Sequence, residues 1–126
     1  MTTLTLPWPP STNHYWRNVG GRVLISAAGR AYRQEIARIA AAGRTRGLVQ
    51  RIPLVDRLSV TIVASPPDRR RRDLDNLLKS LLDALSHASV WLDDSQVDDL
   101  RVIRAAPAKP GRVEITISPL AARVAA

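Results

Sequence analysis

The sequence predicts one α+β domain in which helices pack on a mixed β-sheet. Several segments alternate apolar and polar residues, as half-buried strands do, and two longer segments repeat apolar residues at steps of three and four, as amphipathic helices do. Strands before, between and after the helices are typical of the α+β class. The chain has 126 residues, 45% of them hydrophobic, which is enough for one core and too short for two ordinary domains. We therefore treat residues 1–126 as a single domain.

The first half of the chain predicts a strand, a loop, a short strand and a helix. Residues 2–6 alternate polar and apolar side chains, and Pro7 ends that strand. Residues 11–21, STNHYWRNVGG, are rich in turn formers and predict a loop before a short strand at 23–25. Ser26 is a good N-cap for a helix that runs to about Gly43. The expected core face of this helix consists of Ala28, Ala31, Tyr32, Ile36, Ile39 and Ala40.

The second half predicts a strand, a second helix and two further strands. Residues 58–64 alternate as a strand with one buried face, which Pro66 and Pro67 end. The second helix carries a continuous core-facing stripe of leucines, at positions 74, 77, 78, 81, 82 and 85. Strands follow at 100–105 and 112–118, and the APAKPG segment between them allows an irregular hairpin. Residues 119–126 are expected to form a flexible tail.

Charge is distributed unevenly along the chain. The formal net charge is +8, from 19 basic and 11 acidic residues. Between Asp68 and Asp99 lie five basic and eight acidic residues, a net charge of −3, so the other fourteen basic and three acidic residues carry +11. A basic body attracts polyanions, and its long-range field speeds their capture. The competing interpretation is an arginine-biased composition that serves only solubility.

Composition excludes several kinds of chemistry. The chain has no cysteine, so it offers neither redox chemistry nor a thiolate zinc site. His14 and His87 are its only histidines and do not have the spacing of a zinc motif. No stretch of 18 apolar residues and no leader-like N-terminus occurs. We therefore expect a soluble, cytoplasmic protein without a membrane partner.

The acidic segment contains the candidate metal ligands. Two aspartates stand at the predicted start of the second helix and four follow its end, namely Asp73 and Asp75, then Asp93, Asp94, Asp98 and Asp99. A strand–loop–helix–loop path can bring the second group back beside the first turn of the helix. Hard carboxylate oxygens without histidine or thiolate suit Mg²⁺ or Mn²⁺, which polarise a phosphoryl oxygen. The ordinary structural alternatives are helix capping by Asp73 and a surface pair between Asp75 and Lys79.

Basic residues adjoin these carboxylates. The run RRRR at 69–72 leads directly into Asp73, and we expect Arg69, Arg70 and Arg71 to contact phosphates of a nucleic acid. Arg72 is close enough in sequence to stabilise a pentacovalent phosphate, and Lys79 would neutralise charge that develops there. Asp75, Lys79 and Asp83 are expected on the solvent-accessible side of the helix, opposite the leucines. A solvated, flexible charge cluster is the alternative for the arginine run.

The predicted loop at 11–21 supplies further candidate contacts to the substrate. Asn13, Tyr15 and Arg17 are polar or aromatic residues in this turn-rich stretch. Tyr15 and the adjacent Trp16 could stack on exposed bases of a nucleic acid. Packing of these aromatic rings in the core is equally compatible with the sequence.

Four blocks of the sequence resemble the RusA family of Holliday-junction resolvases. They stand in the family's order and read PWPPSTNHYWR at 7–17, SAAGRAYR at 26–33, PDRRRRDLDNLLKSLLDAL at 67–85 and VWLDDSQVDD at 90–99. The third and fourth blocks are the specific ones. Ser89 departs from the glycine that relatives often carry before the aromatic residue of the fourth block.

The resemblance implies a homodimeric endonuclease, dependent on Mg²⁺ or Mn²⁺, that binds four-way DNA junctions and cuts two strands symmetrically. It assigns metal ligation to Asp73, Asp75 and Asp94, the family's essential lysine to Lys79, and the arginine before the first aspartate to Arg72. It also implies an α+β fold whose subunits place two active sites across the junction. The approximate two-fold symmetry of a junction makes paired sites reasonable.

Two other functions remain compatible with the residues alone. One is a non-catalytic, basic DNA-binding module in which the acidic residues only offset arginines and cap helices. The other is a metal-dependent nuclease that acts on other branched DNA or on RNA. Neither the residues nor the resemblance assigns a role to Asp93, Asp98 or Asp99.

Overall fold

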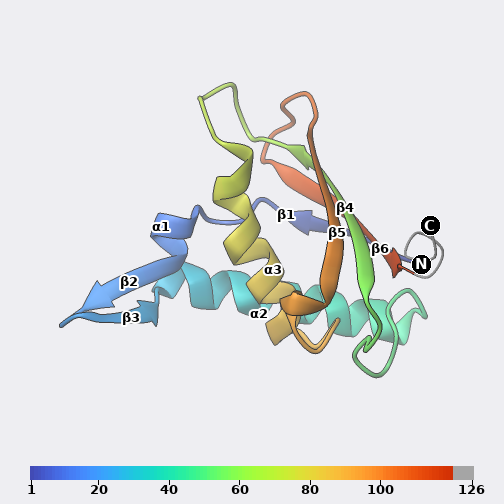
Figure 1. Ribbon diagram of the computed structural model, residues 1–126. Coiled ribbons are helices and arrows are strands. Elements are labelled where there is room, and N and C mark those ends of the chain that lie inside the picture. The colour runs from blue at the N-terminus through green and yellow to red at the C-terminus, as the bar shows by residue number, and fades with distance from the viewer. Residues whose placement is uncertain (121–126) are drawn as a thin grey trace.

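A four-stranded mixed β-sheet forms the centre of the computed structural model, which describes residues 1–120 (Figure 1). Its strands stand in the order β1-β6-β4-β5. β6 pairs antiparallel with both β1 and β4, whereas β4 and β5 run parallel. The strands span Thr2–Pro7 (β1), Leu58–Ser65 (β4), Val97–Arg104 (β5) and Arg112–Pro119 (β6). The predicted α+β class, a mixed sheet with two main helices, is confirmed.

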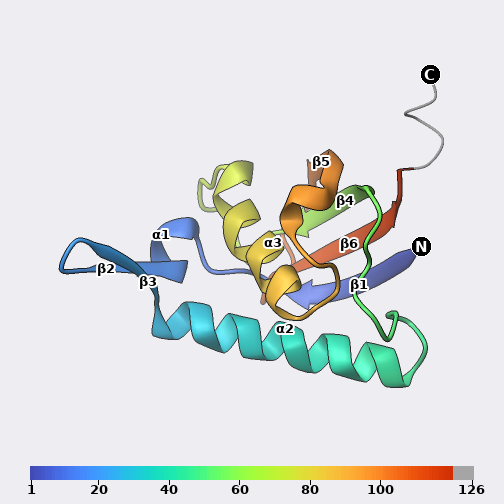
Figure 2. The same ribbon diagram turned by 60° about the horizontal axis from the view of Figure 1, so that its bottom comes forward.

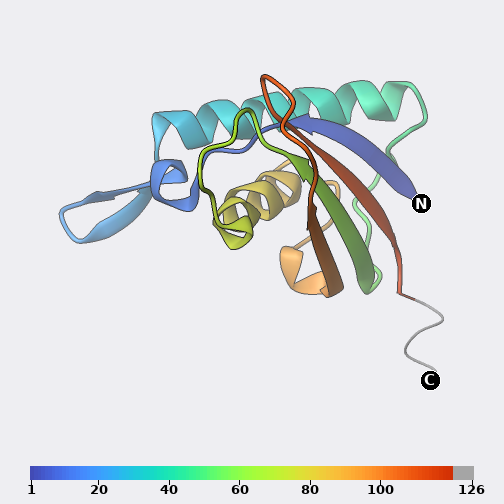
Figure 3. The same ribbon diagram turned by 90° about the horizontal axis from the view of Figure 1, so that it is seen from above.

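One face of the sheet is apolar and carries the two main helices, α2 (Ala27–Thr45) and α3 (Leu78–His87). Figure 2 shows α2 running along one side of the sheet, and in Figure 3 α3 lies between α2 and β5. In β4, Leu58, Val60 and Ile62 are at most 1% exposed, and the residues between them are only partly buried. Burial of each such side chain stabilises the fold by about 1.5–3 kcal/mol, so the alternation decides which face the helices cover.

Helix α2 begins where the sequence predicts. The Ser26 hydroxyl accepts a hydrogen bond from the backbone N–H of Gly29 at 2.9 Å, which is the expected N-cap contact. The buried stripe is rotated from the predicted one, because Ala28 and Ala31 are exposed. The residues that α2 buries are Gly29, Tyr32, Ile36, Ala40 and Gly43. At Gly29 a Cβ atom would lie 2.4 Å from the backbone oxygen of Tyr15, so only glycine allows this close approach.

The second predicted helix consists of two parts. A 3₁₀ turn, η1 (Leu74–Leu77), leads directly into α3. Leu77, Leu81 and Leu85 are buried, and Leu78 and Leu82 pack against the same core. The leucine stripe therefore faces inward as predicted, apart from a partly exposed first member.

The prediction of a loop over residues 11–21 is wrong. The segment forms the short helix α1 (Thr12–Tyr15) and the strand β2 (Trp16–Val19), which pairs with β3 (Arg22–Ile25) in a hairpin. Gly20 and Gly21 have φ angles of +56° and +77°, the left-handed conformation that a tight hairpin turn requires. The turn-forming residues that predicted a loop here serve this turn, and the hairpin projects from the body (Figure 1).

Two expectations for the C-terminal part are corrected. β5 and β6 do not form a hairpin, because β6 lies between β1 and β4 and β5 pairs with the other side of β4. Pro119 belongs to β6, and the backbone N–H of Leu120 donates to the carbonyl of Arg57 at 3.0 Å, so the predicted tail does not begin at residue 119. Residues 121–126 of that tail lie outside the described residues. Within residues 1–120, no helix is long and apolar enough to cross a membrane.

Candidate functional site

The arginine-rich segment between β4 and η1 is fixed by its own contacts. The Asp68 carboxylate accepts hydrogen bonds from Arg72 Nη1 at 2.7 Å and from the backbone N–H of Arg70 at 2.9 Å. These hydrogen bonds lower the pKa of Asp68 to about 2, and the bond from Arg72 has the largest effect. Arg104 of β5 donates to the backbone carbonyl of Arg72 at 2.7 Å. Arg72 is consequently held in place and partly buried, while the other three arginines of the run are exposed.

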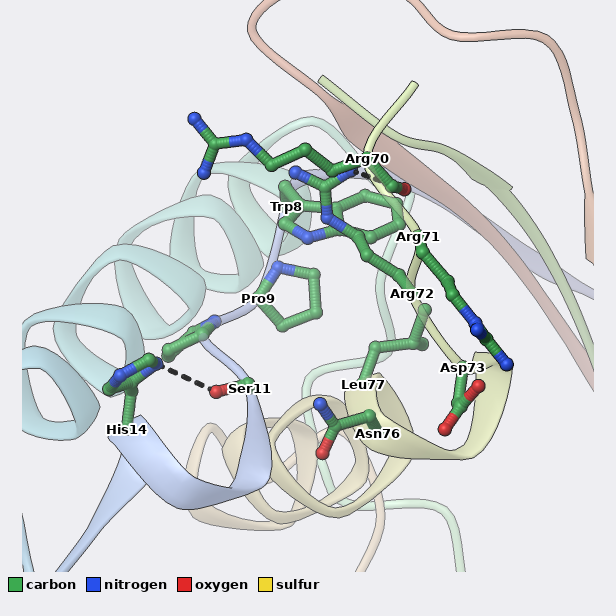
Figure 4. Close-up of a pocket in the computed structure, with 11 residues that line it drawn as sticks. Trp8, Pro9, Ser11, His14, Arg70, Arg71, Arg72, Asp73, Asn76 and Leu77 are labelled. Carbon is green, nitrogen blue, oxygen red and sulfur yellow. Dashed lines mark hydrogen bonds between the residues drawn. The ribbon is translucent and has the colours of Figure 1, made fainter. Parts of the chain in front are cut away.

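A cavity of about 360 Å³ lies between this segment and the N-terminal loop (Figure 4). Residues 8–11 and 14 form one wall, and residues 70–73, 76 and 77 form the other. The Arg72 guanidinium lies over the indole of Trp8, with Cζ 5.9 Å from the ring centroid. The cavity therefore adjoins Asp73, the first candidate metal ligand.

Five of the eight carboxylates between Asp68 and Asp99 are engaged by the protein itself. Their partners are Arg72 for Asp68, Arg33 for Asp83, the backbone N–H of Ser95 for Asp93, Arg57 for Asp98 and Ser59 for Asp99. Within residues 1–120, the carboxylates of Asp73, Asp75 and Asp94 make no hydrogen bond or ion pair. These three are the aspartates that the family resemblance assigns to the metal.

The three aspartates without a predicted role have structural ones. Asp93 caps the 3₁₀ turn η2 (Asp94–Gln96) in a capping box with Gln96, and hydrogen bonds from Ser95 lower its pKa. Asp98 pairs with Arg57, whose Nε lies 2.8 Å from Oδ2. The Ser59 hydroxyl donates to Asp99 at 2.9 Å, across the parallel pair of strands.

Asp94 lies at the opposite end of α3 from Asp73 and Asp75. Figure 1 shows residues 74–77 at the upper end of α3 and residues 94–96 at its lower end. Trp91 ties the approach to η2 to the last turns of α3, since its Nε1 donates to the Ser86 hydroxyl at 2.7 Å. The ten residues of α3 rise by about 15 Å. Accordingly, the described part of the chain contains no group of three or more acidic or histidine side chains that could hold a metal ion.

The expected return of the acidic loop to the first turn of the helix is therefore wrong for one chain. β4 and β5 are parallel, so α3 must carry the chain back to the level where β4 begins, and η2 lies there. Asp73 and Asp75 lie at the other end of α3, two positions apart in the sequence, and both are exposed. A pair of carboxylates fits Mg²⁺, which is commonly bound through one or two carboxylates, waters and substrate phosphates. The predicted three-aspartate set is incomplete in a single chain.

Lys79 is exposed on α3 and makes no hydrogen bond or ion pair within residues 1–120. Asp83, one turn later, is only partly solvent-accessible, because Arg33 Nη2 of α2 lies 2.8 Å from its Oδ2. The Tyr15 hydroxyl donates to the same carboxylate oxygen, and Arg33 Nε lies 2.9 Å from that hydroxyl. These side chains form a cluster that joins α1, α2 and α3.

The proposed stacking of Tyr15 on DNA bases is also wrong. Its side chain is 0% exposed, and burial followed by the hydrogen bond to Asp83 raises the pKa of its hydroxyl. Asn13 and Arg17 are exposed, at α1 and β2, so their substrate contacts stay predictions. Sequence reasoning missed the cavity residues of the N-terminal loop and Asn76. The signal for the loop was a tryptophan flanked by three prolines in PWPPS, which carried the family resemblance but was not assigned to a binding site.

The fold and this surface define a small α+β protein that presents partly buried and exposed arginines beside carboxylates without partners among residues 1–120, a combination suited to acting on nucleic acids. Over residues 7–118 the chain matches the family model described as Endodeoxyribonuclease RusA, and it belongs to that family.

Relatives match nearly the whole chain. A crossover junction endodeoxyribonuclease of Enterobacteria phage 82 is 50% identical over 115 residues, which cover 91% of this chain and 92% of that protein. Proteins of the same name from Escherichia coli K12 and Shigella sonnei are each 47% identical over 116 residues, covering 92% of both chains. The family resemblance predicted from the four sequence blocks is confirmed.

Proposed function

We propose that this protein is a crossover junction endodeoxyribonuclease that resolves four-way DNA junctions by paired, symmetric cuts. Support comes from relatives of that name that are 47–50% identical over more than nine-tenths of the chain. The observation in the structure that carries the proposal is the selective engagement of the acidic residues. Of eight aspartates in the acidic segment, the three that have no partner among residues 1–120 are those that the family motif assigns to a metal ion. Acting on cellular DNA, the enzyme would work in the cytoplasm.

The chemistry that we propose depends on a divalent ion, Mg²⁺ or Mn²⁺. Once bound, such an ion would supply Lewis-acid polarisation of a phosphoryl oxygen. Arg72, which Asp68 holds in place, and Lys79 would contribute positive charge beside the reacting phosphate. The exposed side chains of Arg69, Arg70 and Arg71 would hold the flanking DNA backbone.

We further propose that a homodimer completes the metal site, with Asp73 and Asp75 from one protomer and Asp94 from its partner. The separation of Asp94 from the other two within one chain favours this arrangement. When the α3 helices of two protomers run antiparallel, the two-fold axis between them places the C-terminal end of each helix beside the N-terminal end of the other. It would then bring Asp94 of each chain to the aspartate pair of the other, forming two equivalent sites.

The edge of the sheet offers a surface for such pairing. β5 is an edge strand and runs from the Asp94 end of α3 to the level of Arg72. Leu100 and Ile103 of this strand are 40% and 37% exposed. Exposed apolar side chains beside an unpaired strand edge are typical of a surface that another chain covers.

The test is cleavage of a synthetic four-way junction, with the linear duplex of one arm as the comparison. Wild-type protein should give paired nicks with Mg²⁺ and none with EDTA. Asp75→Asn should abolish cleavage while junction binding survives. Asp56→Asn is the matched control, because it removes the same charge from an exposed aspartate outside the site and should leave cleavage unchanged.

The outcomes separate the competing functions. Junction binding without metal-dependent products would indicate a non-catalytic DNA-binding module. Equal cleavage of flaps, duplex or RNA at the same salt concentration would indicate a nuclease of other specificity, since phosphate-driven affinity varies steeply with salt. Unchanged cleavage by Asp75→Asn would remove the proposed site.

A further inference from the structure

The cavity beside Asp73 has walls that phosphate binding does not require. Trp8 and Pro9 contribute apolar, partly planar surface to one wall, and Leu77 and the side chain of Asn76 belong to the opposite wall (Figure 4). Its volume of about 360 Å³ lies at the small end of the range of roughly 300–1,000 Å³ for small-ligand pockets. Positive charge at a surface is enough to bind a backbone phosphate, whereas a flat ring binds between apolar walls of this kind.

The N-terminal wall is held rigidly by both main helices. The carbonyl of Pro7 accepts a hydrogen bond from the Tyr32 hydroxyl of α2 at 2.8 Å, and that of Pro10 accepts one from Ser80 of α3 at 2.6 Å. The Thr12 hydroxyl donates to the backbone carbonyl of Asn76 at 3.1 Å, which links the two walls. The cavity is therefore preformed, and a ligand need not order its walls.

Arg72 and Trp8 together form a planar platform in the cavity. The guanidinium lies over the indole, and Asp68 and Arg104 fix the arginine from behind. Unstacked bases in nucleic-acid complexes commonly stack on aromatic rings or on guanidinium planes. Figure 4 shows Arg70 reaching across the top of the cavity, where it can meet the phosphate of a nucleotide whose base lies inside.

We propose that this cavity accepts an unstacked base of the DNA strand that passes Asp73, with the Asn76 amide at the edge of that base. The inference rests on the proposed function and adds a base-binding site to it. A base at the crossover of a junction has lost stacking continuity, so it can leave the helix at lower cost than a base inside a duplex. The cavity thereby favours junctions over linear DNA.

Two substitutions weaken the site in different ways. Trp8→Leu keeps apolar volume but removes the ring of the platform, and it should reduce junction affinity by about 5- to 150-fold, the range of one base–aromatic stack. Asn76→Ala removes an exposed side chain and leaves the backbone contacts of this residue in place. It should reduce junction affinity by about 2- to 10-fold. Affinity for linear duplex, measured without metal at the same salt, should change little in either variant.

The decisive measurement couples these variants to abasic substitutions in the junction. Single abasic nucleotides are placed at successive positions around the branch point, and binding of each junction is measured in EDTA. In wild-type protein, one symmetric pair of positions should lose about as much affinity as Trp8→Leu does. At that position Trp8→Leu should show no further loss, whereas at other positions the two losses should multiply. Trp16→Leu, at the other partly buried tryptophan of this region, should retain the full abasic effect.

Each outcome either supports or overturns the proposed base-binding site. Coupling of one abasic position to Trp8 and to Asn76 supports the base site. Losses that multiply at every position, or coupling to Trp16 in place of Trp8, overturn it even if the enzyme cleaves junctions normally. If Trp8→Leu melts at a much lower temperature than wild type, the coupling to Asn76→Ala alone decides. Failure of wild-type protein to bind junctions in preference to duplex would instead overturn the proposed function.

Discussion

Mixing two inactive variants should restore cleavage if the metal site is shared between protomers. Two oxygens on one Mg²⁺ lie at most about 4.2 Å apart, twice the metal–oxygen distance. About 15 Å of helix separates Asp94 from Asp73 and Asp75 within a chain. Asp94 therefore cannot join the other two in cis without rearrangement of α3. In trans, Asp75→Asn and Asp94→Asn affect different halves of each site.

The expected recovery follows from the pairing. In a mixed dimer, one site carries both substitutions and the other carries neither, so one intact site remains. Random exchange of equal amounts gives about half mixed dimers, and hence about one quarter of the wild-type number of sites. The product should change as well, because a single intact site nicks one strand and does not make the paired cut.

A supercoiled plasmid that extrudes a cruciform reports both features. Paired cuts linearise it, whereas single nicks leave an open circle. Each variant carries a different affinity tag, so that mixed dimers can be purified and shown to have formed. Open-circle product from mixed dimers, with neither parent active, is the expected result. Mixed dimers as inactive as both parents would refute a shared site and place all three ligands in one chain.

Three further predictions concern the supports of the site. Arg33→Gln should destabilise the fold by about 1–3 kcal/mol in urea unfolding. This value lies between those for exposed and buried ion pairs, because the side chains of Arg33 and Asp83 are 22% and 28% exposed. A loss of stability below about 0.5 kcal/mol would contradict the prediction. Asp68 has a native pKa of about 2, below the value of about 3.9 in unfolded chains, so its pairing with Arg72 stabilises the fold at neutral pH and ceases to do so as pH falls from about 4 to 2. The stability difference between wild type and Asp68→Asn should accordingly shrink across that interval, and a difference independent of pH would exclude the pairing as its cause. Gly29→Ala should destabilise by about 1–3 kcal/mol in thermal unfolding, because its Cβ would meet a backbone oxygen at 2.4 Å, and a neutral effect would show that α1 can move away.

Periodicity predicted the parts of the fold that depend on local pattern. β4, α2 and α3 each bury one side, and the spacing of apolar residues along the sequence indicates an element with one buried side. Strand order did not follow, because the insertion of β6 between β1 and β4 depends on long-range pairing that no local pattern encodes. In the hairpin at 16–25, the second strand was predicted at 23–25, whereas β2 was missed because it is short and exposed and has no buried alternation.

The site was predicted as far as sequence adjacency reaches. Arg72, Asp73 and Asp75 stand together in the motif, and the structure places them at the start of η1. The position of Asp94 depends on the direction in which α3 returns, and that is set by the parallel pairing of β4 and β5. Tyr15 illustrates the same limit, because the partner that buries its hydroxyl, Asp83, lies 68 positions away.

The cluster around Asp83 also has an electrostatic consequence for Lys79. Asp83 follows Lys79 by four positions on α3, a spacing at which the two charges would ordinarily pair. Arg33 and Tyr15 take up the Asp83 carboxylate instead, from α2 and α1. A divalent ion would likewise engage Asp75, the acidic neighbour four positions before Lys79. Lys79 would then have no internal counter-charge on its helix, so its ammonium group would be available to a phosphate. Arginine pairs at Asp68, Asp83 and Asp98 thus offset part of the negative charge of the acidic segment, and we propose that a metal ion supplies positive charge at Asp73, Asp75 and Asp94.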